Sequence, residues 1–504
     1  MVQFKVMRKL FWKTSVLSIA ILLCGFNVVI AQKQDRIWLF SDSAGIDFND
    51  LSNPVAIRSN ISDPCLTNFT SIANGQGDLL FYTSAVELSL NAVRVFDMYG
   101  SLMENGDSLQ GYPWVGQGSM IIPMPGDSMK YYLFTGNRTG SMGNNMYYNI
   151  IDMSYNGGLG KVVSKNNLLL ADYVNEKLNA TKHANGRDWW VVVMSSNTDQ
   201  LYHKFLITPS GIQGPFDQLI GSIDNPNKFF GQMIFSKDGN KLVVASYNSV
   251  LDVFDFDRCT GDLFNYQAAG EPTTVSTNRY YGCSISANEE VLYASSWEYE
   301  FKNVYQFDLL ASNIHATKQT IISYPDTGQL KYLYFGEILL GPDDRIYLTK
   351  GDNFQGPFSN TYYTHHMDVI LNPDNLGVNC NYQQSYFDLG NGRTIIGLPT
   401  MVNYNLGPVI GSICDSLSTG IQEQESGEKA IQFYPNPFTK ELSVHSVYPI
   451  NILLKLYNEL GELVYSKKIN GNETIDVGFL PSGNYFIEAI SDKNIFRKRL
   501  VKME

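Results

Sequence analysis

The chain of 504 residues carries a formal net charge of -12, with 17% charged and 13% aromatic residues. Because an acidic chain repels the phosphate backbone, we exclude nucleic acid as a partner. The low charge content and the abundant Tyr and Phe are typical of an extracellular β protein rather than of a cytosolic enzyme. The length allows one large domain and a smaller one.

Residues 1–31 have the pattern of a secretory signal peptide. Four basic residues between positions 5 and 13 precede an apolar run over residues 15–30, and a small residue, Ala31, stands before Gln32. We therefore expect the secretory translocase to carry the chain and the mature protein to begin at Gln32. An uncleaved membrane anchor is the alternative. No later segment is long and apolar enough to span a bilayer.

A hairpin pattern recurs over residues 37–406, in which an apolar strand, a turn rich in Asn, Asp and Gly, and a second apolar strand follow one another. The repeat spacing is roughly 50 to 60 residues, close to that of propeller blades. The turns lie at Asn74-Gly75, Pro125-Gly126-Asp127, Asn185-Gly186, Asp238-Gly239, Asn288-Glu289 and Asp343-Asp344.

A second marker keeps the same period: strands end in an apolar residue followed by Asp, or by Thr in one divergent copy. The pairs are Phe96-Asp97, Ile151-Asp152, Ile207-Thr208, Phe256-Asp257 and Phe307-Asp308. Each repeat thus offers about four short strands, as in the blades of propellers. A four-stranded sheet cannot bury both faces alone, so such sheets stack radially and close into a β-propeller.

The two ends of this region decide the number of blades. Six repeats are clear, and the remaining segments 37–40 and 395–404 would pair as a seventh blade, which removes exposed sheet edges. We predict an all-β fold with a seven-bladed propeller over residues 32–410, and six blades are the alternative. A string of sandwich domains fits less well, because no Pro/Ser-rich linker interrupts the repeats.

Four segments of the repeat region carry a family resemblance: residues 152–160, 182–190, 254–261 and 397–399. They resemble secreted WD40-like or YVTN-like propellers of Bacteroidota, which are joined to type IX sorting domains. That family is defined by its architecture, so the resemblance transfers no catalytic residue to this chain.

Catalytic motifs are weak throughout the sequence. Gly106-Asp107-Ser108-Leu109 matches the nucleophile block of one esterase class, but no histidine has an aspartate three residues before it to supply the base. The chain has no Gly-x-Ser-x-Gly elbow, no His-Glu-x-x-His zinc pair and no phosphate-binding glycine loop. We therefore predict neither catalytic nor cofactor-binding residues.

Two clusters could hold a metal ion. In His365-His366-Met367-Asp368, neighbouring side chains of a strand point to opposite faces, so only one histidine could join the aspartate. Asp252, Asp255 and Asp257 offer oxygen atoms but lack the spacing and the glycine of a calcium loop. Solvated strand ends explain both clusters better, and structural calcium stays open as an alternative.

The mature chain keeps five cysteines, and export through the periplasm permits disulfides. Cys259 follows the third strand of one repeat and Cys283 lies near the first strand of the next, so adjacent blades could bring them together. Cys65 and Cys380 lie in the first and last repeats, which ring closure makes neighbours. We expect these two disulfides and a free Cys414.

The last segment, residues 431–504, has the pattern of a small, independent β domain. Short apolar strands alternate with turns, as in an immunoglobulin-like sandwich. The prolines on both sides of Asn436 favour an extended start, because proline fixes its own φ and restricts the preceding residue. Residues 411–430, rich in Ser, Thr and Gly and then acidic, predict a linker before this domain.

Landmark residues occur in this domain in a fixed order and end in a basic tail. They include Tyr434, Pro435, Asn436, Pro437, Gly461, Gly483, Tyr485, Lys498 and Lys502. This set resembles the type A C-terminal sorting domain of the type IX secretion system of Bacteroidota. The resemblance implies an outer-membrane translocon as partner, removal by a sortase-like peptidase near the linker, and attachment to lipopolysaccharide or release. A carbohydrate-binding or immunoglobulin-like appendage is the alternative.

Two classes of function remain for the exported propeller. In the first, loops at one end of the central channel bind an unknown glycan or protein, and the aromatic loops 111–114, 297–299 and 360–363 suit this role. These aromatics could equally pack between blades. In the second, polar residues from several blades meet in the channel as the site of a hydrolase or lyase.

The two classes predict different channel mouths. A carboxylate pair or a histidine-metal cluster would favour the enzyme, whereas an aromatic mouth without perturbed acids would favour binding. We expect a cell-surface or secreted binding protein. We rank a purely structural role in a surface layer after both the binding function and the enzyme function.

Overall fold

The structure is a computed structural model that describes residues 32–503 except for short internal gaps. The gaps are residues 60, 62–66, 87–91, 113–115, 139–143, 172–173, 196–199, 223–229, 248, 271–278, 298–300, 326–332, 353–360, 416–430, 447–450, 459–461 and 491–494. The chain divides into two compact units, Met1–Ser416 and Leu417–Glu504. The predicted signal peptide and the cleavage residue Ala31 lie outside the described part, which begins at Gln32.

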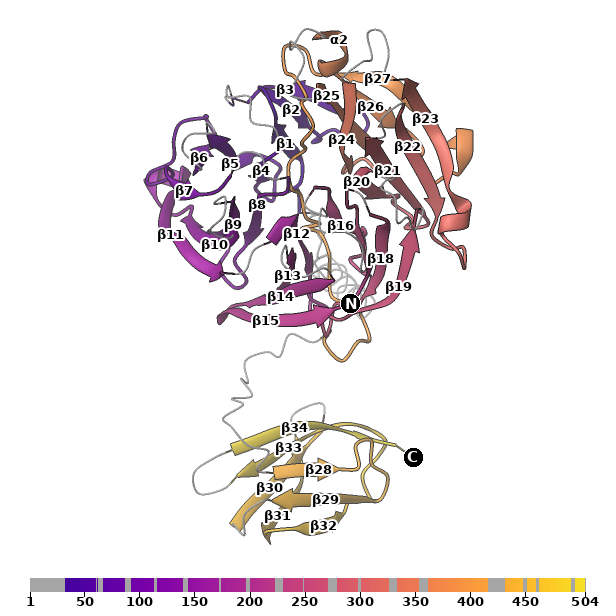
Figure 1. The fold of residues 1–504 in the computed structure, drawn as a ribbon. Coiled ribbons are helices and arrows are strands. Elements are labelled where there is room, and N and C mark those ends of the chain that lie inside the picture. The colour runs from indigo at the N-terminus through magenta and orange to yellow at the C-terminus, as the bar shows by residue number, and fades with distance from the viewer. Residues whose placement is uncertain are drawn as a thin grey trace, which may run out of the picture. The chain divides into compact units, whose positions relative to one another are not determined.

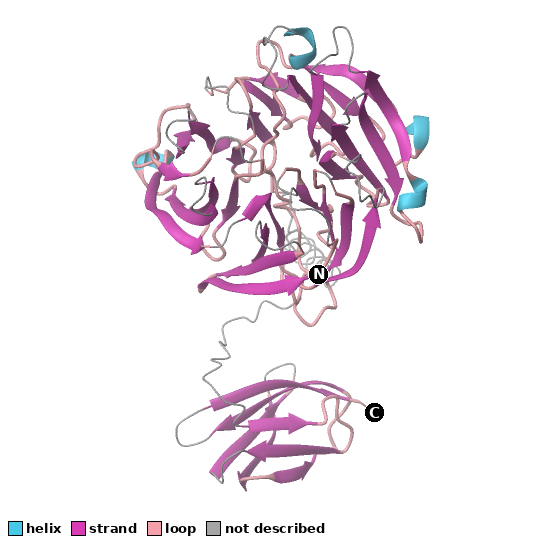
Figure 2. Cartoon of the chain, in the orientation of Figure 1, coloured by secondary structure: helices cyan, strands magenta, loops and turns pink. Residues whose placement is uncertain are grey.

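The first unit is a ring of radial antiparallel sheets (Figure 1). Six sheets have four strands each, and we number these blades I to VI in chain order. Neighbouring blades contact through their first strands, which line the centre of the ring. Strands dominate the described residues, as Figure 2 shows.

The strands of the six blades follow one another without crossovers. Blades I to III are β4 (Phe69–Ala73), β5 (Leu79–Val86), β6 (Ala92–Asp97) and β7 (Leu109–Gln110); β8 (Ser119–Pro123), β9 (Lys130–Arg138), β10 (Asn144–Asp152) and β11 (Lys161–Leu170); β12 (Val174–Lys182), β13 (Trp189–Ser195), β14 (Leu201–Thr208) and β15 (Gly211–Leu219). Blades IV to VI are β16 (Met233–Phe235), β17 (Lys241–Val244), β18 (Leu251–Phe256) and β19 (Leu263–Ala269); β20 (Tyr280–Ile285), β21 (Val291–Trp297), β22 (Phe301–Asp308) and β23 (Gln319–Pro325); β24 (Leu333–Leu340), β25 (Ile346–Asp352), β26 (His366–Ile370) and β27 (Tyr382–Asp388).

Helical structure in the described residues is limited to short turns at the periphery of the blades. They are α2 (Thr361–Thr364) and the 3-10 turns η2 (Asn156–Gly158), η3 (His315–Thr317) and η5 (Gly377–Cys380). No helix in this part of the chain has the length and apolar character needed to cross a bilayer.

A further blade combines both ends of the first unit. Its sheet contains β1 (Ile37–Phe40), β2 (Ala44–Asp47) and β3 (Val55–Ile57) in that order. Residues 393–415, which we call the closing segment, begin beside this sheet, where Arg393 and Asp42 exchange two backbone hydrogen bonds of 2.9 and 3.2 Å. The ring thus agrees with the seven blades predicted from the pairing of the two ends.

The closing segment then passes between the innermost strands of blades VI and I. The Glu337 N–H donates to the Ile396 carbonyl (2.7 Å), and the Thr400 N–H donates to the Phe69 carbonyl (2.9 Å). The buried hydroxyl of Tyr404 reaches the Ile121 carbonyl of blade II (2.9 Å). In Figure 1 the segment crosses the middle of the ring as an orange trace.

Side-chain turns explain the first sequence marker. In blade I the Asn74 side-chain oxygen accepts the N–H of Gln76 (2.8 Å), and in blade IV Asp238 accepts the N–H of Asn240 (2.8 Å). The same bond recurs at Asp127, Asn185, Asn288 and Asp343. Such Asx turns favour a tight hairpin because the side chain mimics a backbone turn.

The second marker has the same physical origin at the end of the third strand. Asp97 accepts the N–H of Tyr99 (2.9 Å), and Asp257 accepts the N–H of Cys259 (2.7 Å). In the divergent copy the Thr208 hydroxyl accepts the N–H of Ser210 (3.1 Å). The repeating aspartates therefore serve turn formation, which also accounts for Asp257 in the predicted oxygen cluster.

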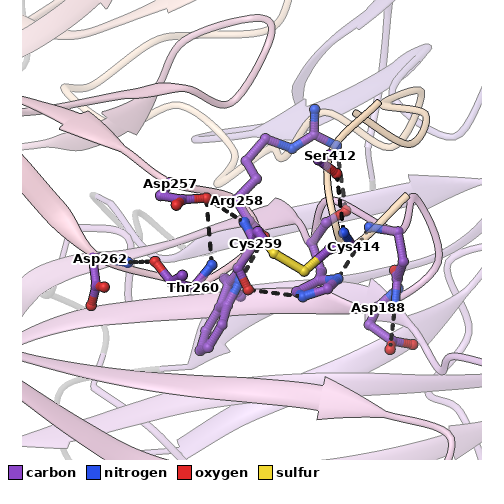
Figure 3. Close-up of a disulfide and its surroundings, with 11 residues drawn as sticks. Asp188, Asp257, Arg258, Cys259, Thr260, Asp262, Ser412 and Cys414 are labelled. Carbon is purple, nitrogen blue, oxygen red and sulfur yellow. Dashed lines mark hydrogen bonds between the residues drawn. A yellow bond between two sulfur atoms is a disulfide. The ribbon is translucent and has the colours of Figure 1, made fainter. Parts of the chain in front are cut away.

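The disulfide of the first unit joins Cys259 to Cys414, with a Cα–Cα distance of 5.7 Å (Figure 3). Cys283 and Cys380 are free and buried. Both predicted pairings, Cys259 with Cys283 and Cys65 with Cys380, are therefore wrong, as is a free Cys414. Cys65 itself lies in one of the gaps.

The path of the closing segment is the physical reason for this pairing. After crossing the ring it reaches the turn between β18 and β19, where Arg258 donates to the Gly407 carbonyl (2.6 Å). The Val409 N–H bonds to the Ala184 carbonyl (2.8 Å). The Cys283 sulfur instead points into the core between blades IV and V, 3.5 Å from the Gln232 carbonyl oxygen.

The second unit contains two sheets around one apolar core. Their orders are β28-β29-β32 and β31-β30-β33-β34. The strands are β28 (Ile431–Tyr434), β29 (Glu441–Ser446), β30 (Asn451–Tyr457), β31 (Leu463–Asn470), β32 (Glu473–Asp476), β33 (Gly483–Ile490) and β34 (Ile495–Lys502). Phe438, Leu454, Ile487 and Leu500 are fully or almost fully buried between them. This arrangement agrees with the predicted sandwich.

Candidate functional site

The central channel of the propeller has two different ends. At the connection end, the fourth strand of one blade leads to the first strand of the next. At the hairpin end lie the Asx turns between the first and second and between the third and fourth strands. The described residues place aromatic and acidic side chains at the connection end, which we treat as the candidate site.

Five aromatic residues from blades IV to VI gather at the connection end, and we call them the aromatic mouth. The Trp297 ring stacks on Tyr281 with centroids 4.2 Å apart and an interplanar angle of 13°. The Trp297 ring also packs edge-to-face with Tyr334 and Tyr247, with ring centroids 5.4 and 6.1 Å apart. Tyr247 packs in turn against Phe230, with centroids 6.2 Å apart. Offset and edge-to-face contacts of this kind hold aromatic rings in fixed orientations.

Two cations border the aromatic mouth. The Arg279 guanidinium lies 5.2 Å from the centroid of the Tyr247 ring, and the Lys302 ammonium lies 4.7 Å from that of Tyr334. Phe230 is 39% exposed, whereas Tyr281 is buried beneath Trp297. The mouth therefore offers solvent an aromatic surface, while Lys302 is only 1% exposed and its ammonium group is buried.

A pair of carboxylates lies inside the channel beside the aromatic mouth. Glu176 on β12 and Glu337 on β24 are both buried and both face Gly116. A Cβ atom placed on Gly116 would lie 3.1 Å from Glu176 Oε2 and 3.3 Å from Glu337 Oε1. Glycine at position 116 thus leaves the space in which the two acids converge from non-adjacent blades.

Burial perturbs the ionisation of these groups. It raises the pKa of Glu337 to about 8, and the negative charge of Glu176 adds to this effect, while the Leu398 N–H opposes it. That N–H donates to Glu337 Oε2 (2.6 Å). Burial also raises the pKa of Tyr281, with contributions from both carboxylates. Glu337 is therefore a carboxylic acid that stays protonated near neutral pH.

Two glutamines bridge the channel between its ends. The Gln117 amide donates to the Met233 carbonyl and accepts the Met233 N–H, both at 2.7 Å. Gln232 accepts the N–H groups of Cys283 (2.9 Å) and Ile338 (3.1 Å). Because Gln117 belongs to blade II and Met233 to blade IV, the bond spans the intervening blade. The two glutamines therefore tie non-adjacent strands together between the two ends of the channel.

Of the three predicted aromatic loops, the structure brings Trp297 into the mouth. Residues 113–115, 298–300 and 353–360 fall in the gaps, so most of these loops lie outside the described residues. The ring of Tyr363 instead lies 5.4 Å from the Lys350 ammonium. Sequence reasoning missed Glu176 and Glu337, and no local motif marks them. The available signal was an acidic residue in the first strand of a repeat.

The predicted histidine cluster does not converge. His365 Nδ1 bonds to the Gly392 carbonyl (2.6 Å), and His366 Nε2 lies 3.9 Å from an Asp388 carboxylate oxygen. Asp368 is fully buried and pairs with the equally buried Lys350.

The remaining predicted oxygen donors are also engaged separately. Asp252 accepts from the Ser222 hydroxyl (3.1 Å), and Asp255 pairs with Lys241 (2.7 Å). Within the described part of the chain, no group of three or more His, Cys, Asp or Glu could hold a metal ion.

In the second unit, several landmark residues meet where the chain enters the sandwich. The Asn436 side-chain oxygen accepts the Val501 N–H (2.8 Å), and the Lys502 ammonium lies 6.0 Å from the Phe438 ring centroid. Lys498 reaches the Phe433 carbonyl (3.5 Å). Gly461 falls in a gap. The first strand of the domain is thus tied to its basic last strand.

A match to a known family covers this region. Residues 432–503 match the family model of the secretion system C-terminal sorting domain. The C-terminal unit is a type IX sorting domain. It marks the chain for export across the outer membrane, to the cell surface or to the medium. No curated protein matches the chain.

Solved structures similar to the chain include several propellers. One is a Bacteroides uniformis protein provisionally named a 6-phosphogluconolactonase, with 13% identity over 72% of this chain and 98% of that one and a TM-score of 0.44. The Cps50 (Swd1) β-propeller domain of Myceliophteria thermophila has 11% identity over 64% of this chain and 94% of its own length, with a TM-score of 0.34. The Dos1 propeller has 14% identity over 70% of this chain and 75% of its own length, with a TM-score of 0.37.

Proposed function

We propose that the protein is an exported binding protein whose aromatic mouth holds a glycan or protein ligand at the connection end of the propeller. The observation that best supports this proposal is the cluster of aromatic rings packed around Trp297, which Arg279 and Lys302 border. Aromatic rings give a large contact area at little entropic cost, and their faces suit both sugar rings and cationic side chains.

Binding of the full mature chain to immobilised mucin glycoprotein, xylan and laminarin tests this proposal. Trp297→Ala removes the centre of the aromatic mouth, so we expect at least a tenfold loss of affinity for the surface that the unaltered protein binds. Tyr155→Ala is the matched control, because Tyr155 is 46% exposed beside η2 and outside the mouth. Equal loss in both variants would contradict the proposal.

The export route carries further steps that belong to this proposal. The signal peptide is removed between Ala31 and Gln32, a sortase-like peptidase removes the sorting domain within residues 411–430, and the propeller is attached to lipopolysaccharide or released. The sorting domain supports this order. Mass spectrometry of cell fractions should find mature termini outside the cell only when the type IX translocon is present. If the full chain, ending at Glu504, stayed in the periplasm both in the native strain and in a strain that lacks the type IX translocon, the proposed export route would be refuted.

A secreted hydrolase or lyase is the second candidate, and the carboxylate pair specifically favours it. A protonated Glu337 could donate a proton while Glu176 accepts one, the division of roles that general acid-base catalysis needs. Release of reducing ends from xylan and laminarin tests this role. Turnover that Glu337→Gln abolishes, with binding retained, would support the enzyme over the binding protein.

Structural calcium stays a prediction that the described residues leave untested. A fall in the melting temperature of the mature chain on addition of EDTA, reversed by excess calcium, would support it.

A further inference from the structure

The hairpin end of the channel contains a cavity of about 320 Å³. Blades III to VI contribute residues such as Thr181, Phe235, Ser284 and Leu339, and the chain at the start of β1 contributes Asp35, Arg36 and Trp38. The remaining wall comes from the closing segment, through Met401, Val402, Asn403 and Asn405. None of the five residues of the aromatic mouth lines this cavity, and the hydrogen-bonded Gln117 and Gln232 are not part of its wall.

Buried polar atoms of the residues that line the cavity lack hydrogen-bond partners within the described structure. They are Asp35 Oδ1, Arg36 Nε, Trp38 Nε1 and Thr181 Oγ1. The first two lie 3.6 Å apart, too far for a hydrogen bond. A buried polar atom without a partner is unfavourable because it has lost its hydrogen bonds to water, so water or a ligand should satisfy these groups.

The charges around the cavity balance. Asp35 stands beside Arg36, and Lys237 pairs with Asp344 at 2.5 Å. The side chains of Lys237 and Asp344 are 46% and 53% exposed, which places this pair where the cavity opens to solvent. Two opposite pairs leave no net charge to attract an ion, so the cavity suits a neutral ligand.

The rest of the lining is apolar. Ile234, Phe235, Ile285, Leu339 and Val402 contribute hydrocarbon and aromatic surface. A ligand that fits must combine hydroxyl groups, which both donate and accept hydrogen bonds, with apolar faces. The volume is at the small end of the range for small-molecule sites.

We propose that the cavity at the hairpin end binds a neutral polyhydroxylated molecule of the size of one or two sugar rings. Its hydroxyl groups bond to Asp35, Arg36 and Thr181, and its carbon-bound hydrogens pack on the apolar lining. The closing segment holds its wall in place because it is anchored beyond the cavity, at Gly407 by Arg258 and at Cys414 by the disulfide. This site is independent of the aromatic mouth.

Saturation-transfer NMR and calorimetry on the full mature chain test the proposal with defined probes. The probes are glucose, galactose, N-acetylglucosamine, maltose and lactose, with glucose 6-phosphate as the charged counterpart. We expect at least one neutral probe to bind, and the phosphate to bind more weakly than glucose. Absence of binding by every neutral probe at millimolar concentration, or tighter binding of the phosphate, would overturn the proposal.

Three variants locate the binding. Thr181→Val keeps the side-chain shape but removes the hydroxyl, and Met401→Trp fills the cavity, so each should weaken probe binding at least tenfold. If Met401→Trp fails to fold, Thr181→Val still decides. Trp297→Ala should leave probe binding unchanged while weakening ligand binding at the aromatic mouth at least tenfold. Probe binding that responds to Trp297→Ala and not to Thr181→Val would reject the cavity as the site.

Discussion

The two ends of the propeller channel are built from the same strands but differ in the arrangement of their charged side chains. At the hairpin end, Asp344 faces Lys237 and turn aspartates accept backbone N–H groups, and Glu289 is the exception, because burial and its contact with Asp238 raise its pKa to about 8. At the connection end, Glu176 and Glu337 converge and raise each other's cost of ionisation, next to stacked aromatic rings. Exposed ion pairs and turn aspartates thus dominate the hairpin end, whereas buried converging carboxylates and stacked aromatic rings dominate the connection end.

The largest expected effect comes from removing the disulfide at the hairpin end. Cys259 and Cys414 are 155 residues apart, and cross-linking such a long loop restricts the unfolded chain. The double variant Cys259→Ser/Cys414→Ser should lose about 4 kcal/mol of unfolding free energy in guanidinium titrations. A reductant should destabilise the unaltered protein and leave the variant unaffected. An equal effect on both would show that the bond does not contribute.

The next effect concerns the carboxylate pair at the connection end. Because the folded pKa of Glu337 is raised to about 8 from 4.5, the folded state holds a proton that the unfolded state releases. Stability should therefore fall as the pH rises from about 4.5 to 8, by an amount on the order of several kcal/mol. Glu337→Gln should remove the part of this slope that Glu337 contributes in unfolding titrations at pH 5 and pH 9, and the rest belongs to Glu289, whose pKa is also raised to about 8. Glu290→Gln, on an exposed turn, is the control and should keep it.

Asp35 provides the corresponding test at the hairpin end. Burial raises its pKa to about 6 from 3.8, against the opposing charges of Arg36 and Lys237. Its contribution should be present below about pH 4 and lost as the pH rises to 6, by about 3 kcal/mol. Asp35→Asn should flatten the stability profile in this lower window only. A change confined to pH 7 to 9 would assign the slope to another group.

The smallest effect concerns a single turn. Asp257→Ala removes the bond to the Cys259 N–H and should cost about 1 kcal/mol. Thermal unfolding measures this loss. Asp255→Ala, on the same strand and paired with Lys241, should cost less because that ion pair is partly exposed. The reverse order would contradict the turn role given to the repeated aspartates.

The fold was predictable where one residue determines one turn. Asn74 and Asp238 mark hairpins that the structure contains, and residues 395–404 could be assigned to ring closure because a leftover strand needs a partner. The landmarks near Asn436 identified the sorting domain for a similar reason, since they lie close together in the sequence.

Features that depend on the path of the chain across the ring were not predictable. The pairing of Cys259 with Cys414 requires the closing segment to reach blade IV, and no local pattern records that route. Glu176 and Glu337 likewise meet only because β12 and β24 face each other across the channel. The candidate site is therefore a property of the closed ring.

The disulfide also determines where tension would act. A force applied to the chain beyond Ser416 reaches Cys414 first, and the covalent bond passes it to the turn between β18 and β19. Without that bond, the same pull would act directly on the hydrogen bonds that hold residues 393–409 in the ring and peel them away one at a time. The disulfide thus allows the propeller to be pulled from its C-terminal side without the closing segment detaching from the ring.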